Sequence, residues 1–313
     1  MSSPTIGKSS TYFQSTLGDC PDSGNGSADS DRGCRSAHPR LADGNNVSGA
    51  QASHGESCRA CGHQTRPLWR GQLMDLEVQY FECPICAYVQ TEQPYWLDRA
   101  YNEVINDSDT GILARNITNA RITITTLSIL RSLHGRVVDL AGGYGLLVRM
   151  LRDYGVDALW HDPYCKNLVA RGFEYQAGSA ELVTAFEAFE HFVEPAAELR
   201  RMLEIAPSVL LSTMVLPNPA PKHMDWWYYG REHGQHVGLF RLQTLRILAA
   251  QTGKTLVSDG YLHHLFSDRH INARRWKLSL RFNRVVPTLL AKRLSSRTWS
   301  DHLLMSRARS ELK

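Results

Sequence analysis

Three features that would restrict the class of this protein are absent from its sequence. It contains no run of about 18 apolar residues, which excludes an ordinary transmembrane helix. The first residues, Met1 to Thr11, are polar and include no apolar signal segment, so we expect a cytoplasmic protein. The net charge is only +4 over 313 residues, which is too small to indicate nucleic-acid binding by itself.

Large apolar side chains are scarce in residues 1–50, which are rich in Ser, Gly, Asp and Asn. A segment of this kind cannot bury enough surface to offset the entropy that ordering costs. We therefore predict a disordered tail over residues 1–50. Elsewhere hydrophobic residues are frequent enough, at 42% of the whole chain, to build a core.

The length allows one large domain and a smaller module. We place a four-cysteine module at 55–95 and the main domain at 96–268. The remainder, 269–313, is rich in Arg and Lys and has a helical pattern. We expect this extension to be a solvated pair of helices, or to contact an acidic partner or a membrane surface.

Two C-x-x-C pairs, separated by 21 residues, are formed by Cys58, Cys61, Cys83 and Cys86. Each pair can place two thiolates on one tetrahedral ion, so the spacing predicts a zinc site. Two disulfides are the alternative, which an intracellular location disfavours. His63 is an alternative ligand to one of the thiolates. Because four protein ligands leave no open position, we expect the zinc to be structural.

A glycine-rich turn follows a short β-branched run that ends at Asp139. The expected strand 136–139 leads through Gly143 and Gly145 into an expected helix over 146–154. Glycines let the backbone approach a ligand, and the helix N-terminus directs free N–H groups at it. A second strand is expected at 156–161, and the carboxylate of Asp162 can accept hydrogen bonds from both hydroxyls of a ribose.

This turn alone would suit a nicotinamide, a flavin or S-adenosylmethionine (SAM), or an α/β domain without a cofactor. Its pattern, D-x-A-G-G-x-G, resembles the first motif of class I SAM-dependent methyltransferases, with Ala141 in place of the usual first glycine. The resemblance implies a doubly wound, Rossmann-like α/β fold with a seven-stranded sheet. It also implies that five residues bind SAM: Asp139, Ala141, Gly143, Gly145 and Asp162.

The stretch from Phe186 to Pro195 resembles F-E-V-x-E-H-x-x-D/E-P of a large methyltransferase family whose members act on ubiquinone precursors, sugars and other small molecules. That resemblance puts Phe186 and Glu187 beside the cofactor. Glu190 and His191 match the acid–histidine pair of that family. Because the stretch borders the SAM pocket in that family, the resemblance implies that His191 also binds the cofactor. A histidine that only braces the loop is the alternative for His191.

Residues 226–236 contain four aromatic residues and two histidines. The prolines just before this segment forbid a long helix, so we expect a loop over the carboxyl edge of the sheet, where such folds bind ligands. The aromatic side chains either form the wall of a pocket or belong to the core.

The order of cysteine module, methyltransferase core and aromatic segment is similar to that of zinc-containing deoxysugar C-methyltransferases. In those enzymes an acid–histidine pair near this position removes a proton, and here the corresponding residues are Gln235 and His236. His236 is our first candidate for the base. His233, next to Glu232, is the second. Tyr228 and Tyr229 are candidates to orient the acceptor.

The sequence therefore predicts an enzyme that transfers a methyl group from SAM to a small molecule such as a sugar or a nucleotide-sugar. Two alternatives are a nucleic-acid or protein methyltransferase and a scaffold with a SAM-type fold but no activity. The base-flipping motif expected of a nucleic-acid methyltransferase is absent from residues 184–187.

Overall fold

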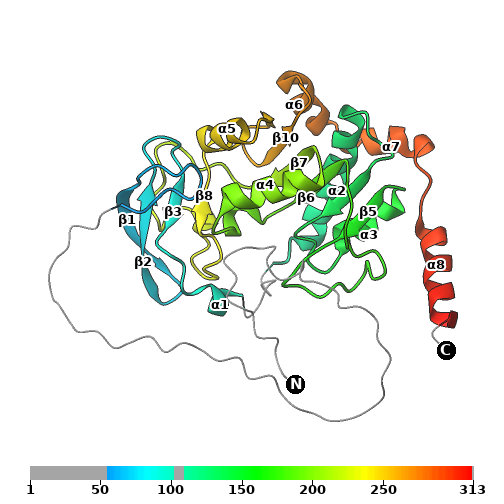
Figure 1. Ribbon diagram of the computed structural model, residues 1–313, viewed down its shortest axis with the longest axis horizontal. Helices are drawn as coiled ribbons and strands as arrows, with labels where there is room; N and C mark the ends of the chain where they lie inside the picture. Colours follow the sequence, from blue (N-terminus) through cyan, green and yellow to red (C-terminus); the bar gives the residue numbers. More distant parts are fainter. Residues whose placement is uncertain (1–54, 102–108, 312–313) are drawn as a thin grey trace, which may run out of the picture.

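The computed structural model describes residues 55–101 and 109–311 of the chain. Two β-sheets organise this part: a small antiparallel sheet at one end and a larger mixed sheet in the middle (Figure 1). The predicted tail, 1–50, lies outside the described residues.

The larger sheet has the strand order β5-β4-β6-β7-β10-β9. Its strands are β4 Arg136–Asp139, β5 Asp157–Trp160, β6 Leu182–Ala185, β7 Ser208–Ser212, β9 Thr255–Ser258 and β10 His263–Ser267. The first four strands in the spatial order are parallel, and β10 is antiparallel to both of its neighbours. The carboxyl ends of β4 and β6 therefore share one edge, as the sequence predicts.

The expected count of seven strands is not reached, because the structure forms six in this sheet. At the outer edge, next to β5, the chain makes a single parallel bridge between Trp160 and Glu174. The prediction of seven strands rested on a family resemblance and not on a strand pattern around Glu174. The backbone there pairs with β5 at one residue only.

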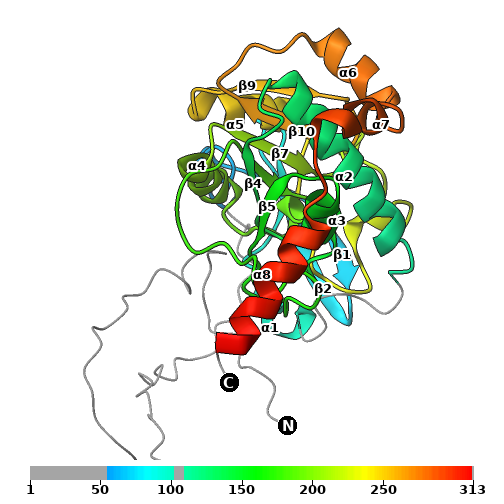
Figure 2. The same cartoon turned by 90° about the vertical axis from the view of Figure 1, so that its right-hand side faces the viewer.

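Helices cover both faces of this sheet, in agreement with a doubly wound fold (Figure 2). The helices that do so are α2 Ile112–Ile129, α3 Leu146–Asp153, α4 Pro195–Ile205, α5 Leu242–Gln251 and α6 Ala273–Arg281. Successive strand residues point to opposite faces. Accordingly, Val137 packs in a cluster with residues of α2, α3 and α6, whereas Val138 packs with residues of α4 and α5.

The small sheet belongs to the four-cysteine module, with one strand contributed from far along the chain. Its order is β1-β2-β3-β8, with β1 Arg66–Leu73, β2 Leu76–Glu82, β3 Val89–Thr91 and β8 Gly238–Leu239. The sequence predicts short strands at 68–70 and 78–82, and both are present. β8 follows the aromatic segment directly, so this segment is fastened to the cysteine module.

Short helical segments connect these elements, and three of them border the site described below. They are α1 Leu97–Ala100, η1 Phe189–His191 and η2 Trp227–Tyr229. The C-terminal extension continues from α6 through α7 Val286–Leu290, η3 Ala291–Arg293 and α8 Thr298–Glu311. Among the described residues, no helix is both long enough and apolar enough to cross a bilayer.

A buried ion pair fastens α8 to the domain. Asp301 accepts hydrogen bonds from Nε and Nη2 of Arg152, each at 2.8 Å, and both side chains are 4% exposed. Arg149 donates a further bond to Asp301 at 2.9 Å. Removing one member of such a pair leaves a buried charge without a partner.

We expect Asp301→Ala to lower the free energy of unfolding by about 3–5 kcal/mol, the usual cost of breaking a buried pair. Thermal unfolding of the variant should shift down by on the order of 10 °C. Asp75→Ala is the matched control, because the Asp75–Arg99 pair is exposed and its loss should leave the melting temperature unchanged. An equal shift in both variants would contradict the structural role of Asp301.

Candidate active site

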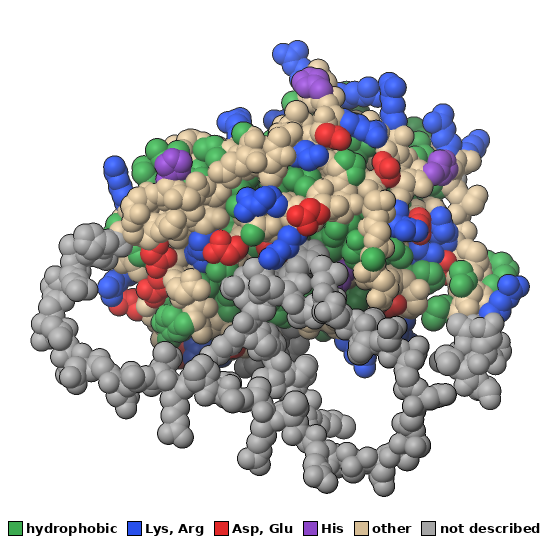
Figure 3. Space-filling view, in the orientation of Figure 1, with side chains coloured by type: hydrophobic (Ala, Val, Ile, Leu, Met, Phe, Trp, Pro, Cys, Tyr) green, Lys and Arg blue, Asp and Glu red, His purple; other side chains and the backbone are tan. Residues whose placement is uncertain are grey.

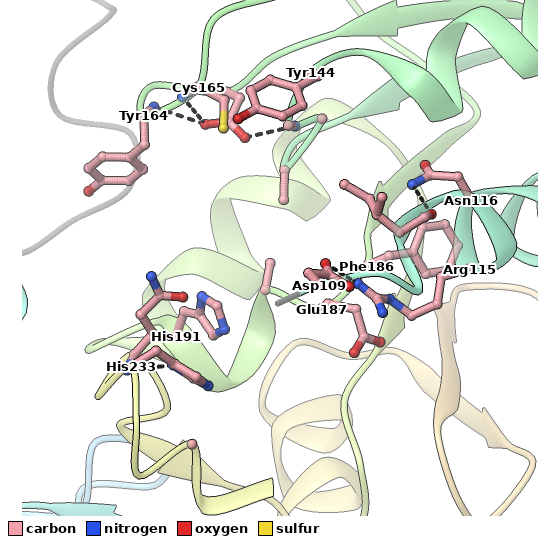
Figure 4. A pocket seen from close by; sticks show the side chains of 18 of the residues that line it. Asp109, Arg115, Asn116, Tyr144, Tyr164, Cys165, Phe186, Glu187, His191 and His233 are labelled. Atoms are coloured by element: carbon pink, nitrogen blue, oxygen red, sulfur yellow. Dashed lines mark hydrogen bonds and ion pairs between the residues drawn. The ribbon is translucent and has the colours of Figure 1, made fainter. Parts of the chain in front are cut away.

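A cavity of about 610 Å³ lies at the carboxyl ends of β4 and β6. It is lined on one side by the glycine turn and on the other by the aromatic segment (Figure 4). In Figure 4, Tyr144, Tyr164 and Cys165 face His191 and His233 across the space. The two parts of the sequence that resemble methyltransferase motifs therefore meet at one cavity.

Most of the residues proposed from the sequence line this cavity: Asp139, Ala141, Gly143, Asp162, Phe186, Glu187, His191, Glu232, His233 and His236. Gly145 does not line the cavity, and it is the residue immediately before α3. Tyr229 is also outside the lining.

The glycine turn requires its glycines for conformational reasons. Gly143 and Gly145 have φ angles of 50° and 89°, in the left-handed region that other residues rarely adopt. A Cβ atom on Gly145 would also lie 2.7 Å from Oδ1 of Asn167. Ala141, which stands where the related motif has glycine, is not among the residues with a positive φ.

The two acids of the turn make different hydrogen bonds, and Asp139 is buried whereas Asp162 is partly exposed. Asp139 accepts a hydrogen bond from Oγ1 of Thr184 at 2.8 Å, and burial raises its pKa to about 7. Asp162 accepts the N–H of Gly143 at 2.9 Å on Oδ2. Its Oδ1 accepts two further backbone N–H groups, at 2.8 and 2.9 Å. Burial raises the pKa of Asp162, although these three hydrogen bonds oppose the shift. Because a carboxylate oxygen can accept two bonds, Oδ2 retains capacity for one hydroxyl of a ligand.

The residue after Phe186 adopts an unusual backbone conformation at the cavity. Glu187 has a φ of 52°, which is uncommon for a residue with a side chain. Ser212 fixes it twice: its Oγ accepts the Glu187 N–H at 2.8 Å and donates to Oε1 at 2.5 Å. This strain directs the Glu187 carboxylate into the cavity.

The sequence left open whether the aromatic segment forms a pocket wall or belongs to the core, and its residues do both. Tyr228 lines the cavity and donates to Oε1 of Glu190 at 2.6 Å. Tyr229 points away, donates to the carbonyl of Pro221 at 2.8 Å and packs edge-on against Trp69 of the cysteine module. Adjacent residues in this turn face opposite sides, so Tyr229 is placed in the core and does not reach the acceptor side of the cavity.

Three histidine rings lie together at this end of the cavity. The centroids of His191 and His236 are 5.0 Å apart, and those of His233 and His236 are 4.9 Å apart. Burial lowers the pKa of all three, in the case of His236 to about 3. The imidazoles are therefore neutral near pH 7.

Their hydrogen bonds assign different tautomers to two of them. Nδ1 of His236 lies 2.6 Å from the carbonyl oxygen of Tyr228, which can only accept, so Nδ1 carries the proton and Nε2 has a free lone pair. Nδ1 of His233 instead accepts the N–H of Gln235 at 3.1 Å, which leaves the proton on Nε2. His236 can thus accept a proton at Nε2, whereas neutral His233 can only donate there.

Glu190, the acid that the family resemblance pairs with His191, does not line the cavity but contacts the lining residue Tyr228. It is fully buried, and burial raises its pKa to about 8. Oε1 accepts the Tyr228 hydroxyl, whereas Oε2 is buried without a hydrogen-bond partner. One ligand atom each from Glu190, His191 and His236 lies within 4.8 Å of the others, a spacing at which they could hold a metal ion.

Arg115 and Asn116 of α2 also line the cavity, and sequence reasoning missed both. Arg115 forms an ion pair with Asp109. The sequence offered no distinct signal for them, because polar residues occur throughout α2. Together with Glu187 and Glu232 they make much of the lining polar.

The four predicted zinc ligands lie together, away from this cavity. Sγ of Cys58 is 3.5 Å from Sγ of Cys86, and Sγ of Cys61 is 3.5 Å from Sγ of Cys83. All four sulfurs lie within 4.8 Å of one another, and none forms a disulfide. Ligands about 2.3 Å from a tetrahedral ion are separated by distances of this size, so the four thiolates fit one zinc ion. His63 is not part of this group.

Comparison with known proteins finds a similarity in the central region of the chain. Residues 113–259 match a family profile described as a methyltransferase domain. No curated protein matches the chain significantly.

Three solved structures illustrate the similarity. Human N-acetylserotonin methyltransferase, in complex with SAM, has 14% identity and a TM-score of 0.39, covering 57% of this chain and 60% of that one. An O-methyltransferase family protein from Burkholderia thailandensis has 13% identity and a TM-score of 0.38, with coverages of 56% and 64%. Magnesium protoporphyrin IX methyltransferase from Synechocystis, with bound SAM, has 12% identity and a TM-score of 0.33, with coverages of 55% and 90%.

The family profile spans the chain from α2 to the end of β9. It thus includes the glycine turn, Asp162 and the aromatic segment 226–236, which also carries His233 and His236 and is called the histidine segment from here on. Most of the cavity lining therefore lies in the region that is similar to a methyltransferase domain.

Proposed function

We propose that the protein transfers a methyl group from SAM to a small, polar acceptor, of which a sugar or a nucleotide-sugar is the best candidate. One observation carries the proposal: the glycine turn and the histidine segment line the same cavity of about 610 Å³. Methyl transfer needs the sulfonium carbon and the acceptor atom in contact and in line. A cavity bordered by both motifs can hold the two partners in this way.

The cofactor end of the cavity is the glycine turn. SAM would meet the backbone of Gly143, the start of α3 and the two acids. Oδ2 of Asp162 is available to a ribose hydroxyl, since it has only one hydrogen bond. Phe186 supplies an apolar surface beside it.

The acceptor end is the region of Arg115, Asn116 and Glu232. Side chains of this kind can donate to and accept from several hydroxyl groups, which favours a polyhydroxylated acceptor over an apolar one. A guanidinium such as that of Arg115 also suits a phosphate group, as a nucleotide-sugar would present.

We assign the base to His236. Its Nδ1–H is fixed by the Tyr228 carbonyl, so Nε2 has the lone pair that a proton acceptor requires. His233 then acts as a hydrogen-bond donor through Nε2, and Glu232 beside it lies on the cavity wall.

The second candidate role for His236 is that of a ligand to a divalent cation. One observation favours it: Oε2 of Glu190 is buried without a hydrogen-bond partner. Two neutral imidazoles and a carboxylate are a common ligand set for a divalent cation. The fixed Nδ1–H of His236 is also typical of a metal-binding histidine. A cation held there would supply charge to the acceptor oxygen, and His236 would then be a ligand and not the base.

We also propose a structural zinc ion on the four thiolates. They form a closed set with no open position for a substrate. The site lies in the module that pairs with β8, so its expected role is to hold the histidine segment in place.

The rival classes, a nucleic-acid or protein methyltransferase and an inactive scaffold, predict different outcomes in one screen. SAM turnover would be measured with nucleotide-sugars, lipids, protein and nucleic acid as acceptors. Methylation of a nucleotide-sugar supports the proposal. Methylation of only a macromolecule, or SAM binding without turnover on any class, favours a rival.

We expect SAM to bind the wild-type protein and Asp162→Ala to weaken binding by about 1–3 kcal/mol, because a ribose hydroxyl would lose its buried partner. Isothermal titration calorimetry measures this directly. Asp225→Ala is the matched control, since Asp225 is exposed and does not line the cavity. Absence of SAM binding by folded wild-type protein would refute the cofactor assignment.

A further inference from the structure

The C-terminal extension carries an unusual surface that the proposed chemistry does not use. Between Arg269 and Ser300 the sequence has nine Arg and Lys residues and no acid. The whole chain has a net charge of only +4, so the remaining residues are net negative. Figure 3 shows these cationic side chains along the upper rim of the molecule, over α6 and α7.

Seven of these cations are exposed and form no ion pair with the described residues: Arg274, Arg275, Lys277, Arg281, Arg284, Lys292 and Arg293. Cations elsewhere in the described chain are more often paired, as Arg149 and Arg152 are with Asp301. A group of unpaired like charges raises the local potential and attracts anions.

An apolar stripe runs through the same surface. It consists of Leu278, Phe282, Val285 and Leu289, which are 55%, 54%, 50% and 71% exposed. The spacing of four, three and four residues places consecutive members one helical turn apart. The backbone supports this, because the N–H of Phe282 bonds to the carbonyl of Leu278, and that of Leu289 to the carbonyl of Val285.

The stripe is not the face by which these helices attach to the domain. That face is formed by Trp276 and Leu280, which are buried in the cluster containing residues of α2 and β9. The four stripe residues lie outside this attached face, and each is half or more exposed. Large exposed apolar patches on soluble proteins usually mark an interaction site.

We propose that α6, α7 and η3 form a docking surface for a bilayer that contains anionic lipids. The apolar stripe would enter the boundary between headgroups and acyl chains, and the flanking cations would pair with lipid phosphates. A second copy of the chain does not fit this surface, because two such faces would bring like charges together. A nucleic acid would pair with the cations and leave the apolar stripe exposed to water.

Vesicle co-sedimentation of the full chain tests the proposal without any measurement of activity. We expect binding to vesicles of phosphatidylcholine with about one third phosphatidylglycerol, weaker binding at high salt, and little binding to phosphatidylcholine alone. Changing all four stripe residues to serine (Leu278→Ser, Phe282→Ser, Val285→Ser and Leu289→Ser) should weaken binding at least tenfold. These side chains are exposed, so the melting temperature should be unchanged.

A control variant removes apolar side chains outside the stripe. Trp299→Ser with Leu304→Ser changes two exposed residues of α8 and should leave vesicle binding unchanged. A charge variant, Arg274→Gln with Lys277→Gln and Arg281→Gln, should lose binding to anionic vesicles.

Two results would overturn the proposal. One is wild-type protein that stays in the supernatant with anionic vesicles at low salt. The other is a stripe variant that binds as well as wild type, since attraction by charge alone then explains the binding. Tighter binding of a DNA duplex than of vesicles would assign the surface to nucleic acid instead.

Discussion

Replacement of His236 by alanine is expected to reduce the rate of methyl transfer by about 10²–10⁴-fold, the usual contribution of a general base. SAM affinity should stay close to that of the wild type, because His236 belongs to the acceptor end of the cavity. The physical reason is the tautomer: Nδ1–H is held by the Tyr228 carbonyl, so the lone pair at Nε2 is available. Single-turnover kinetics with saturating SAM would separate the chemical step from cofactor binding.

His233→Ala is the matched control for this experiment. Nε2 of His233 carries a proton when the ring is neutral, so this variant loses a hydrogen-bond donor but no base. We expect it to reduce turnover less than His236→Ala does. The reverse order would show that the Glu232–His233 pair removes the proton.

The pH dependence provides a further check. Burial lowers the pKa of His236 to about 3, so its basic, neutral form persists well below the ordinary histidine range. The wild-type rate should therefore not fall as the pH drops through 6.5. A loss of activity with an apparent pKa near 6.5 would mean that the base is a more exposed histidine, or that bound ligands restore an ordinary pKa.

If His236 is a cation ligand and not the base, activity should respond differently to added cations and to changes at Glu190. Activity would then depend on an added divalent cation that two imidazoles and a carboxylate favour, such as Fe²⁺ or Ni²⁺. Glu190→Gln would lose as much activity as His236→Ala, because both residues would hold the same ion. A rate unaffected by chelation and by cation addition supports the base.

The residues of the proposed cofactor end could be selected from the sequence because the constraints on them are local. Gly143 and Gly145 occupy positive φ angles that few other residues tolerate, and such positions stand out in a sequence. Asp139 and Asp162 follow β-branched or apolar runs that can be recognised as strands. Each of these signals lies within a few residues of the group that it explains.

The acceptor end depends on contacts between distant segments, which no local pattern encodes. Tyr228 and Tyr229 are neighbours in sequence, yet one meets Glu190 at the cavity and the other packs on Trp69. Which of them faces the cavity depends on the fold around η2. The pairing of β8 with β3 joins residues about 150 positions apart, and a strand of two residues has too little pattern to be predicted.

A zinc ion on the cysteine module should hold the histidine segment in place, because β8 follows that segment and pairs with β3 of the module. We expect one zinc ion per chain, and Cys83→Ser to lower zinc content toward zero in elemental analysis of protein purified without added metal. Structural zinc contributes about 10–16 kcal/mol to the folding of small zinc modules, so its loss should unfold the module. Cys34→Ser, which changes a cysteine outside the two C-x-x-C pairs, is the control and should retain its zinc.

Loss of zinc should affect the two ends of the cavity differently. The histidine segment is tied to the module by the bond from the Met74 N–H to the Arg231 carbonyl, at 2.6 Å, and by the pairing of Val89 with Leu239 just after the segment. The glycine turn is instead held by the larger sheet, next to β5 and α3. We therefore expect the zinc-free variant to bind SAM but to transfer no methyl group. Full activity without zinc, or four cysteines paired as disulfides, would show that the module does not position His236.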